Sequence, residues 1–223
     1  MRPPAYQLLA DELRNEITSG RLQPGERLPP EPELCVRTGV SRSTVREALR
    51  LLASQHLIVT TRGVTGGSFV AHPDATQMAE ALSTGLTLLS NAAEIGMADL
   101  LELRRALEVP AAGLAAARRT DEHLRDIRAT LFDPALDEVA VMIRAHGDFH
   151  AAVAKATANP LFELVTRPLY QVTFGTGLIE AAPDGYWQQI DADHREMLAL
   201  IEANDPQGAT DAARRHLDFV ASL

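Results

Sequence analysis

Four of the seven histidines in this chain are spaced so that they could bind one metal ion. His146 and His150 are four residues apart in an expected helix, so they share one face, with Cβ atoms about 6 Å apart. His194 and His216 each lie eleven residues from Asp205, which sits in an Asn-Asp-Pro turn. If the helices on either side fold back antiparallel, both imidazoles stand about 16 Å from the turn.

Imidazole nitrogen is a good ligand for zinc, nickel, copper and iron. Two histidine pairs at one level of a helical bundle therefore predict a site for a divalent transition metal, with zinc as the first choice and nickel as an alternative. A single histidine on a helix is more often a solvated or a core residue. The symmetry of the spacing is what favours the metal site.

A second group of residues could read DNA. Residues 41–50 form an expected helix in which Val45, Ala48 and Leu49 make an apolar stripe. The side chains off this stripe are basic or carry hydroxyl groups: Arg42, Ser43, Thr44, Arg46 and Arg50. An arginine fork can reach two acceptors on one guanine in the major groove. The alternative for such a helix, taken alone, is a solvated charged face.

The elements around this helix favour DNA reading. We expect helices over residues 5–19, 31–37 and 41–55, then strands over 57–61 and 68–70 joined by a glycine turn. This order is that of a winged helix-turn-helix, which we place at residues 1–73. Arg62 and Gly66 lie in the turn, the wing, where they could approach the DNA backbone or the minor groove.

The rest of the chain, residues 76–223, predicts an antiparallel all-helical bundle, so the fold class is mainly α. The expected helices cover residues 76–90, 97–118, 121–131, 136–158, 160–179, 186–203 and 206–222. Residues 1–75 carry nine arginines against eight acidic residues, whereas residues 76–223 carry twelve basic against twenty-two acidic residues. The excess of acidic residues therefore lies in the carboxy-terminal part, which we call the body. The amino-terminal part, which we call the head, is near-neutral and is compatible with binding DNA.

The composition also indicates where the protein works. There is one cysteine, Cys35, which cannot form an internal disulfide. The first residues do not resemble a signal peptide, and no apolar run approaches the length of a membrane helix. We therefore expect a cytoplasmic protein with no membrane partner.

The head resembles the GntR family of bacterial repressors. The matching strings are Ile17-x-x-Gly20-x-Leu22-x-Pro24-Gly25-x-x-Leu28-Pro29, then Gly39-Val40-Ser41-Arg42-x-x-Val45-Arg46-Glu47-Ala48-Leu49, then Gly66-Gly67-x-Phe69-Val70. The resemblance implies that Arg42 and Arg46 contact DNA, helped by Thr44 and the wing near Gly66. One position departs from the family: Pro32 stands where a further DNA-contacting arginine is usual.

The body resembles the ligand-binding FCD domain of the FadR subfamily of GntR regulators. The motifs are Arg104-x-x-Leu107-Glu108, Phe149-His150, Asn159-Pro160, His194-Arg195 and Asp211-x-x-x-x-His216. Carried over, His150, His194 and His216 match three metal-binding histidines, and His146 stands at the position of an aspartate. Asp148 is two residues out of phase, so we rank it below His146.

The resemblance further implies a small carboxylic acid as the effector. Arg104 matches an arginine that faces the family's cavity, where it could clamp a carboxylate bidentately. An ion pair with Glu108, four residues further along the helix, is the alternative role for Arg104.

These observations predict a non-enzymatic transcription regulator, a repressor that binds a pseudo-palindromic operator as a homodimer. A metal-dependent enzyme with an accessory winged helix is the alternative, although no general acid or base motif accompanies the histidines. A third reading keeps the regulator but makes the metal purely structural, or the pocket empty.

Overall fold

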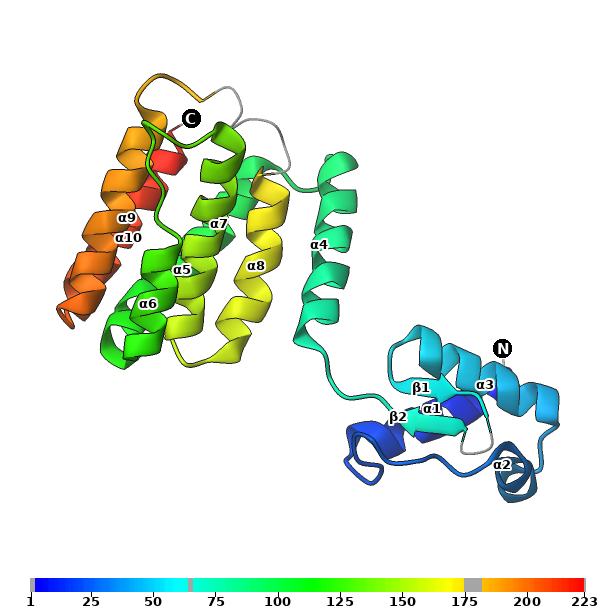
Figure 1. Cartoon of the computed structure of the whole chain (residues 1–223). Coiled ribbons are helices and arrows are strands. Elements are labelled where there is room, and N and C mark those ends of the chain that lie inside the picture. Colours follow the sequence, from blue (N-terminus) through cyan, green and yellow to red (C-terminus); the bar gives the residue numbers. More distant parts are fainter. Residues whose placement is uncertain (1–2, 64–65, 175–181, 223) are drawn as a thin grey trace. The chain divides into compact units, whose positions relative to one another are not determined.

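The chain folds into two compact units, Met1–Asp74 and Ala75–Leu223. The structure is a computed structural model that describes residues 3–63, 66–174 and 182–222 (Figure 1). The described part of the first unit contains three helices and a strand pair, and that of the second is helical.

The first unit is a winged helix-turn-helix. Its elements are α1 (Ala5–Thr18), α2 (Glu31–Thr38), α3 (Arg42–Ser54), β1 (Ile58–Thr61) and β2 (Gly67–Val70). The strands pair antiparallel, with Ile58 opposite Val70. Apolar side chains from all three helices and both strands form one core, in which Leu13, Leu34, Val45 and Leu52 are fully buried.

Local sequence signals place α3 where it is. Gly39 ends α2 with a left-handed φ of 71°, which glycine adopts without a steric penalty. Ser41 then caps α3, because its hydroxyl accepts a hydrogen bond from the Thr44 amide at 3.2 Å. The cap fixes the first turn of α3 and thereby the direction of Arg42 and its neighbours.

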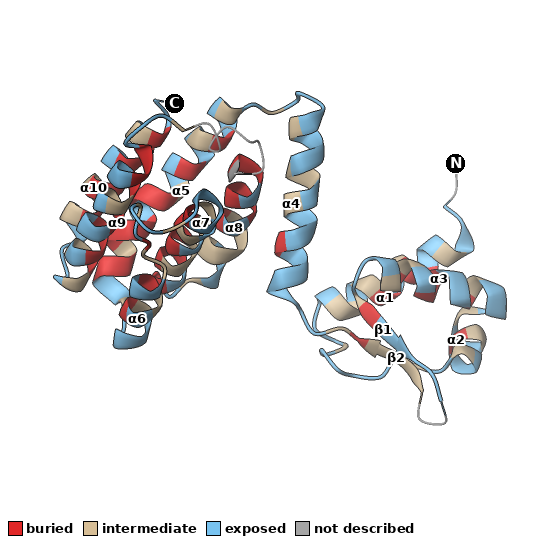
Figure 2. Ribbon diagram, turned by 45° about the horizontal axis from the view of Figure 1, so that its top comes forward, coloured by how far each residue is buried: buried red, intermediate tan, exposed pale blue. Residues whose placement is uncertain are grey.

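The second unit is a helical bundle. It contains α4 (Ala75–Asn91), α5 (Met97–Arg118), α6 (Asp121–Ala129), α7 (Val139–Ala156), α8 (Pro160–Phe174), α9 (Tyr186–Glu202) and α10 (Pro206–Val220). α5 packs on α7, α8, α9 and α10, and α4 packs on α8. The buried residues of α5, α7, α9 and α10 face one another (Figure 2). The bundle therefore has an interior to which each of these four helices contributes.

The predicted fold class is confirmed, with small differences at helix ends. The helix expected at 136–158 begins at Val139, because Asp133 and Asp137 form a turn in which their carboxylates accept backbone amides. The helix expected at 160–179 is described to Phe174, and residues 175–179 lie outside the described residues. No helix in the described part of the chain has the length and hydropathy needed to cross a bilayer.

Gly113 sets how closely α5 and α10 approach. A methyl group at Gly113 would press on the Thr210 hydroxyl and lie 2.9 Å from the carbonyl oxygen of Pro206. Both residues belong to the start of α10, the helix that carries His216. The spacing of these two helices therefore depends on a missing side chain.

We expect Gly113→Ala to lower the free energy of unfolding by about 1–3 kcal/mol, because α10 must move away from α5. The matched control is Gly85→Ala in α4, where the added methyl would meet nothing within 4 Å. There the better helix propensity of alanine should stabilise by about 0.5–1 kcal/mol. Urea denaturation of both variants gives the two values, and equal effects would contradict the close approach.

Candidate metal centre and DNA-binding surface

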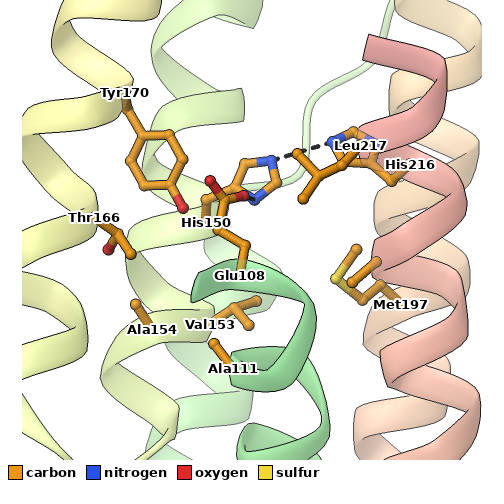
Figure 3. A pocket seen from close by; sticks show the side chains of 11 residues that line it. Glu108, Ala111, His150, Val153, Ala154, Thr166, Tyr170, Met197, His216 and Leu217 are labelled. Carbon is orange, nitrogen blue, oxygen red and sulfur yellow. Dashed lines mark hydrogen bonds and ion pairs between the residues drawn. The ribbon is translucent and has the colours of Figure 1, made fainter. Parts of the chain in front are cut away.

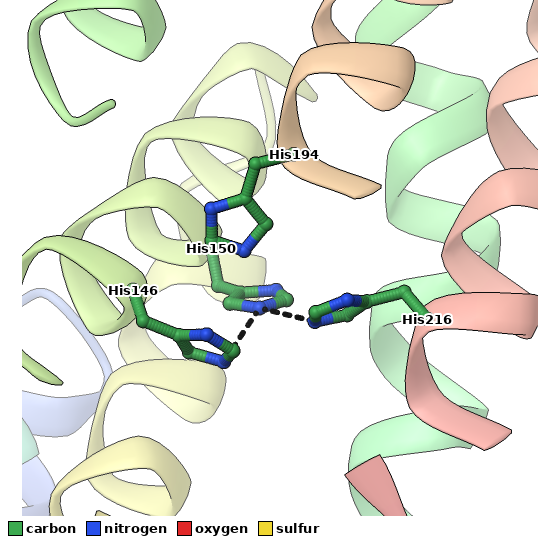
Figure 4. Close-up of side chains that lie close together, drawn as sticks. All are labelled: His146, His150, His194 and His216. Carbon is green, nitrogen blue, oxygen red and sulfur yellow. Dashed lines mark hydrogen bonds between the residues drawn. The ribbon is translucent and has the colours of Figure 1, made fainter. Parts of the chain in front are cut away.

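Four buried histidines meet in the interior of the bundle (Figure 4). His146 and His150 come from α7, His194 from α9 and His216 from α10. One ring nitrogen from each lies within 4.8 Å of those of the other three. The Nε2 atom of His150 is 3.2 Å from Nε2 of both His146 and His216. The structure thus brings together all four histidines that the sequence selected.

Two carboxylates orient this cluster from outside. Glu108 of α5 lies 2.9 Å from Nδ1 of His150, and Asp193 of α9 lies 3.0 Å from Nδ1 of His216. A carboxylate on Nδ1 fixes the tautomer and directs Nε2 the other way. Both rings therefore present Nε2 to the centre of the cluster, as metal-binding histidines do.

The donor set fits a transition metal. Neither ring nitrogen of His194 has a hydrogen-bond partner among the described residues, although the ring is fully buried. A buried polar atom without a partner is costly, and an ion at the cluster would satisfy one of the two nitrogens. Nitrogens around a tetrahedral zinc lie about 3.3 Å apart, which the two 3.2 Å pairs already approach.

Burial keeps the imidazoles in the form that binds metals. It lowers the pKa of His146 and His194 well below the ordinary value, and the neighbouring imidazoles add to this effect. Burial also lowers the pKa of His150 to about 4, although Glu108 opposes the shift. These rings are neutral near pH 7, and a neutral imidazole is the ligand form.

Arg104 forms the ion pair that the sequence offered as its alternative role. Its Nε donates to Glu108 at 2.7 Å, and both side chains are buried. Burial alone would raise the pKa of Glu108, but the charge of Arg104 and the hydrogen bonds from Arg104 and His150 lower it to about 2. The guanidinium also lies 4.9 Å from the centre of the Tyr170 ring. A buried series of polar contacts thus leads to the cluster, from Arg104 through Glu108 to His150.

A small cavity adjoins the cluster on the side of α8 (Figure 3). It is lined by Glu108, His150, Thr166, Tyr170 and His216 together with apolar side chains. Its volume is about 10 Å³. That is room for about one water molecule, so an organic acid would need further space to lie here.

Sequence reasoning missed two groups at this site. The pairing of Glu108 with His150 was not expected, since Glu108 was considered only as a partner of Arg104. Asp193 was overlooked, although it precedes His194 and therefore lies near the level of His216 in the antiparallel pair. Asp148, which was ranked below His146, is exposed and lines a groove between α7 and α8 instead.

The predicted reading residues lie along one helix of the head. Arg42, Ser43, Arg46 and Arg50 of α3 are exposed, and Thr44 is half-buried. The hydroxyls of Ser43 and Thr44 lie 2.8 and 2.9 Å from the Ser41 hydroxyl, so three hydroxyls gather at the start of the helix. Arg50 pairs with Glu47 at 3.2 Å on the surface.

Arg46 has an acidic partner that the sequence did not reveal. Its Nε donates to Glu31 at 2.9 Å, at the beginning of α2. The next residue is Pro32, in the first turn of α2, where a missing amide hydrogen costs nothing. The proline therefore fits the helix without strain, and it directly follows the acidic partner of Arg46.

The backbone of the wing is tightly packed around Gly66. A Cβ at this position would lie 2.6 Å from the carbonyl oxygen of Thr61, so a side chain does not fit. The Gly66 carbonyl accepts a hydrogen bond from Arg27 at 2.6 Å. Arg62 is exposed in the same turn. Arg27, which sequence reasoning had not selected, thus adds a basic side chain beside the wing.

The buried imidazoles predict a loss of stability in acid for protein stripped of metal. The folded state takes up fewer protons than the unfolded state between pH 6.5 and about 4, because the pKa of His150 is lowered to about 4. The free energy of unfolding therefore falls as the pH falls through this range, by about 1.4 kcal/mol per pH unit for each such histidine.

Urea denaturation at several pH values measures this slope, and His146→Asn should make it shallower. Glu108, whose pKa is lowered to about 2, extends the loss of stability below pH 4.5. A free energy of unfolding that is constant between pH 7 and 5 would contradict the burial of neutral imidazoles.

Known proteins resemble this chain over its whole length. A regulator of an L-lactate dehydrogenase operon, so named in Escherichia coli (strain K12), is 29% identical over 95% of this chain and 83% of its own. The HTH-type transcriptional repressor NanR of Klebsiella aerogenes is 30% identical over 97% of this chain and 84% of its own. The solved structure of Streptococcus agalactiae GntR shares the fold, with a TM-score of 0.65 and 24% identity over 97% and 99% of the two chains.

Two family descriptions cover most of the sequence. Residues 5–70 match the bacterial regulatory proteins of the gntR family, and residues 99–219 match the FCD domain. The prediction of a DNA-binding transcription regulator is confirmed, and the comparisons give no support to the alternative of a metal-dependent enzyme. The chain belongs to the GntR family of bacterial regulatory proteins, in the group whose carboxy-terminal part is an FCD domain.

Proposed function

We propose that this regulator is a repressor that binds a pseudo-palindromic operator as a homodimer and responds to a small organic acid. The acid acts in the bundle near a divalent transition metal, with zinc as the first choice and nickel as the alternative. The observation that carries the proposal is the meeting of four buried histidines, two of them oriented by carboxylates, in the chain that also carries the winged helix. Because a bacterial chromosome lies in the cytoplasm, a regulator that binds it would be cytoplasmic.

In this proposal the first turns of α3 read bases. Arg42, Ser43, Thr44 and Arg46 enter the major groove, and Arg50, Arg62 and the wing at Gly66 contact the backbone or the minor groove. Arg46 meets Glu31 through Nε, and its terminal nitrogens have no partner among the described residues. These nitrogens remain available for a guanine. Because Pro32 stands where the resemblance leads us to expect a DNA-contacting arginine, we expect weaker binding or a changed operator sequence at the base pair which that arginine would contact.

A dimer is supported by exposed apolar side chains on the bundle. Met78, Leu82 and Leu89 lie on one face of α4, with 55%, 41% and 39% of their surface exposed. Such a stripe is a candidate for burial against a second copy in a two-fold interface. Two heads related by that symmetry would match two half-sites of a pseudo-palindrome.

We assign the carboxylate of the acid to Arg104. Glu108 forms an ion pair with the guanidinium and also contacts His150. An acid that reaches Arg104 would therefore also change the contacts that orient His150 in the cluster. A metal at the cluster would supply a positive charge for the acid. Coupling of this kind between an effector site and a DNA site is typically 1–3 kcal/mol, or about 5–150-fold in affinity.

Loss of one reading arginine should weaken operator binding. We expect Arg42→Ala and Arg46→Ala each to raise the dissociation constant by about 5–150-fold, since a bidentate contact to guanine is worth about 1–3 kcal/mol. Arg125→Ala, which removes an exposed arginine from α6, should leave it within about two-fold. Gel shifts with the DNA next to the regulator's own gene measure these constants. Equal losses in all three variants, or no shift by the native protein at low salt, would contradict the assignment.

Protein purified without a histidine tag should contain about one transition-metal ion per chain. His194→Ala should lose the ion and unfold at a lower temperature, and Asp193→Asn should bind zinc about 10–100-fold more weakly because His216 loses its orienting carboxylate. His72→Ala removes an exposed histidine outside the cluster and should retain the ion. Elemental mass spectrometry and thermal unfolding provide the readouts. A native chain that remains metal-free after incubation with zinc would refute the metal centre.

A further inference from the structure

A groove runs along the outside of the bundle between α7 and α8. Its volume is about 250 Å³, far more than the water-sized cavity beside the histidines. Gly147 and Ala151 of α7 line it, and because glycine has no side chain and alanine only a methyl group, they leave room between the two helices. The groove is large enough for a small organic acid.

Two arginines stand at this groove, Arg144 on α7 and Arg167 on α8. Both are exposed, and neither has an ion-pair partner within the ranges that the structure describes. Most other arginines on the surface of this unit pair with an acidic side chain, for example Arg195 with Asp191 and Arg215 with Glu196. Arg125 of α6 also lacks such a partner, but it does not line this groove, whereas Arg144 and Arg167 both do. Two guanidinium groups at one groove are candidate ligands for an anion.

One acidic residue, Asp148, also lines the groove. Its charge offsets one of the two arginines, so the groove keeps a net charge of about one positive unit. A guanidinium fork matches the geometry of a carboxylate and can bind it through two parallel hydrogen bonds. The chemistry favours a small carboxylate over a neutral molecule of the same size.

Tyr170 connects the groove with the histidine cluster. Among the residues that the structure describes, it alone lines both the groove and the cavity of about 10 Å³ beside His150 and His216. Its ring stacks on His150 with centres 5.2 Å apart, and Arg104 lies over the same ring. In Figure 3 the phenol side chain reaches from α8 toward Glu108 and His150. Tyr170 is buried, and its side chain lies between the groove and the cavity.

We infer that the groove between α7 and α8 binds small carboxylates and is their entrance to the histidine cluster, with Tyr170 as a movable partition. This inference rests on the proposed metal centre and adds the route by which an acid reaches it. It also accounts for the water-sized cavity, since the space for an acid comes from the groove once Tyr170 has turned.

The test uses the full-length zinc-loaded protein and two chelators that differ in charge. Dipicolinate carries two negative charges, and 1,10-phenanthroline is neutral. Replacing both Arg144 and Arg167 by glutamine should slow zinc removal by dipicolinate by about 10-fold at low salt, because the attraction of the groove is lost. Removal by phenanthroline should stay within about two-fold. The charge-matched control, Arg214→Gln with Arg215→Gln on α10, should change neither rate.

Variants of Tyr170 test the partition. Tyr170→Leu should speed removal by both chelators, and Tyr170→Phe, which keeps the ring, should remain close to the native rate. Trp187 is the sole tryptophan of the chain and its ring lies 6.4 Å from His146, so its fluorescence follows the loss of zinc. A removal rate that is independent of chelator concentration, or equal slowing of both chelators by the arginine variant, would overturn the inference.

A second measurement separates this inference from the metal centre. Calorimetry with metal-free protein should show dipicolinate binding that the variant at Arg144 and Arg167 loses and the control variant retains. Absence of this binding refutes the groove even when zinc is retained. Failure to retain zinc, measured before any chelator is added, refutes the metal centre and with it the role of the groove as an entrance. In that case the calorimetry alone decides whether the groove binds carboxylates.

Discussion

The buried ion pair of Arg104 and Glu108 is the interaction on which the carboxy-terminal unit depends. A guanidinium fully enclosed in an apolar bundle is tolerable only with a counter-charge and hydrogen bonds, and removal of one partner leaves the other as an isolated buried charge. Glu108 has a second duty, since its other oxygen meets Nδ1 of His150. The same carboxylate thus neutralises an arginine, fixes a tautomer and sets the direction of a candidate metal ligand. α5, which carries the pair, is also the helix on which α7, α8, α9 and α10 pack.

Much of this arrangement could be predicted from the sequence, because helices obey simple periodicity. The four-residue spacing of His146 and His150 fixes one shared face, and the equal distances of His194 and His216 from Asp205 fix one shared height. Neither argument requires knowledge of side-chain packing. The head was predictable for a similar reason, since Gly39, Ser41 and the apolar stripe of α3 are local signals for its position.

What the sequence did not reveal depends on contacts between distant segments. The pairing of Asp193 with His216 and that of Glu31 with Arg46 join residues of different helices, and their geometry is set by side-chain rotamers. The hydrogen bond from Arg27 to Gly66 spans 39 positions and depends on the wing folding back. The position of Tyr170 between the groove and the cavity could not be predicted either. In the sequence, a tyrosine on an amphipathic helix is indistinguishable from an ordinary core residue.

His146, where the resemblance led us to expect an aspartate, has a consequence for the energetics of sensing. Four neutral imidazoles would leave a dication with its full charge. Of the two carboxylates that contact the histidines, Glu108 is already paired with Arg104, which leaves the charge of Asp193. An organic anion near such an ion gains more than it would near one already neutralised by a bound carboxylate. Linkage then requires the anion to tighten the hold on the metal by the same factor. The concentration of free metal in the cell would therefore set the concentration of acid at which this regulator responds, so that a single protein would respond only when both metal and acid are present.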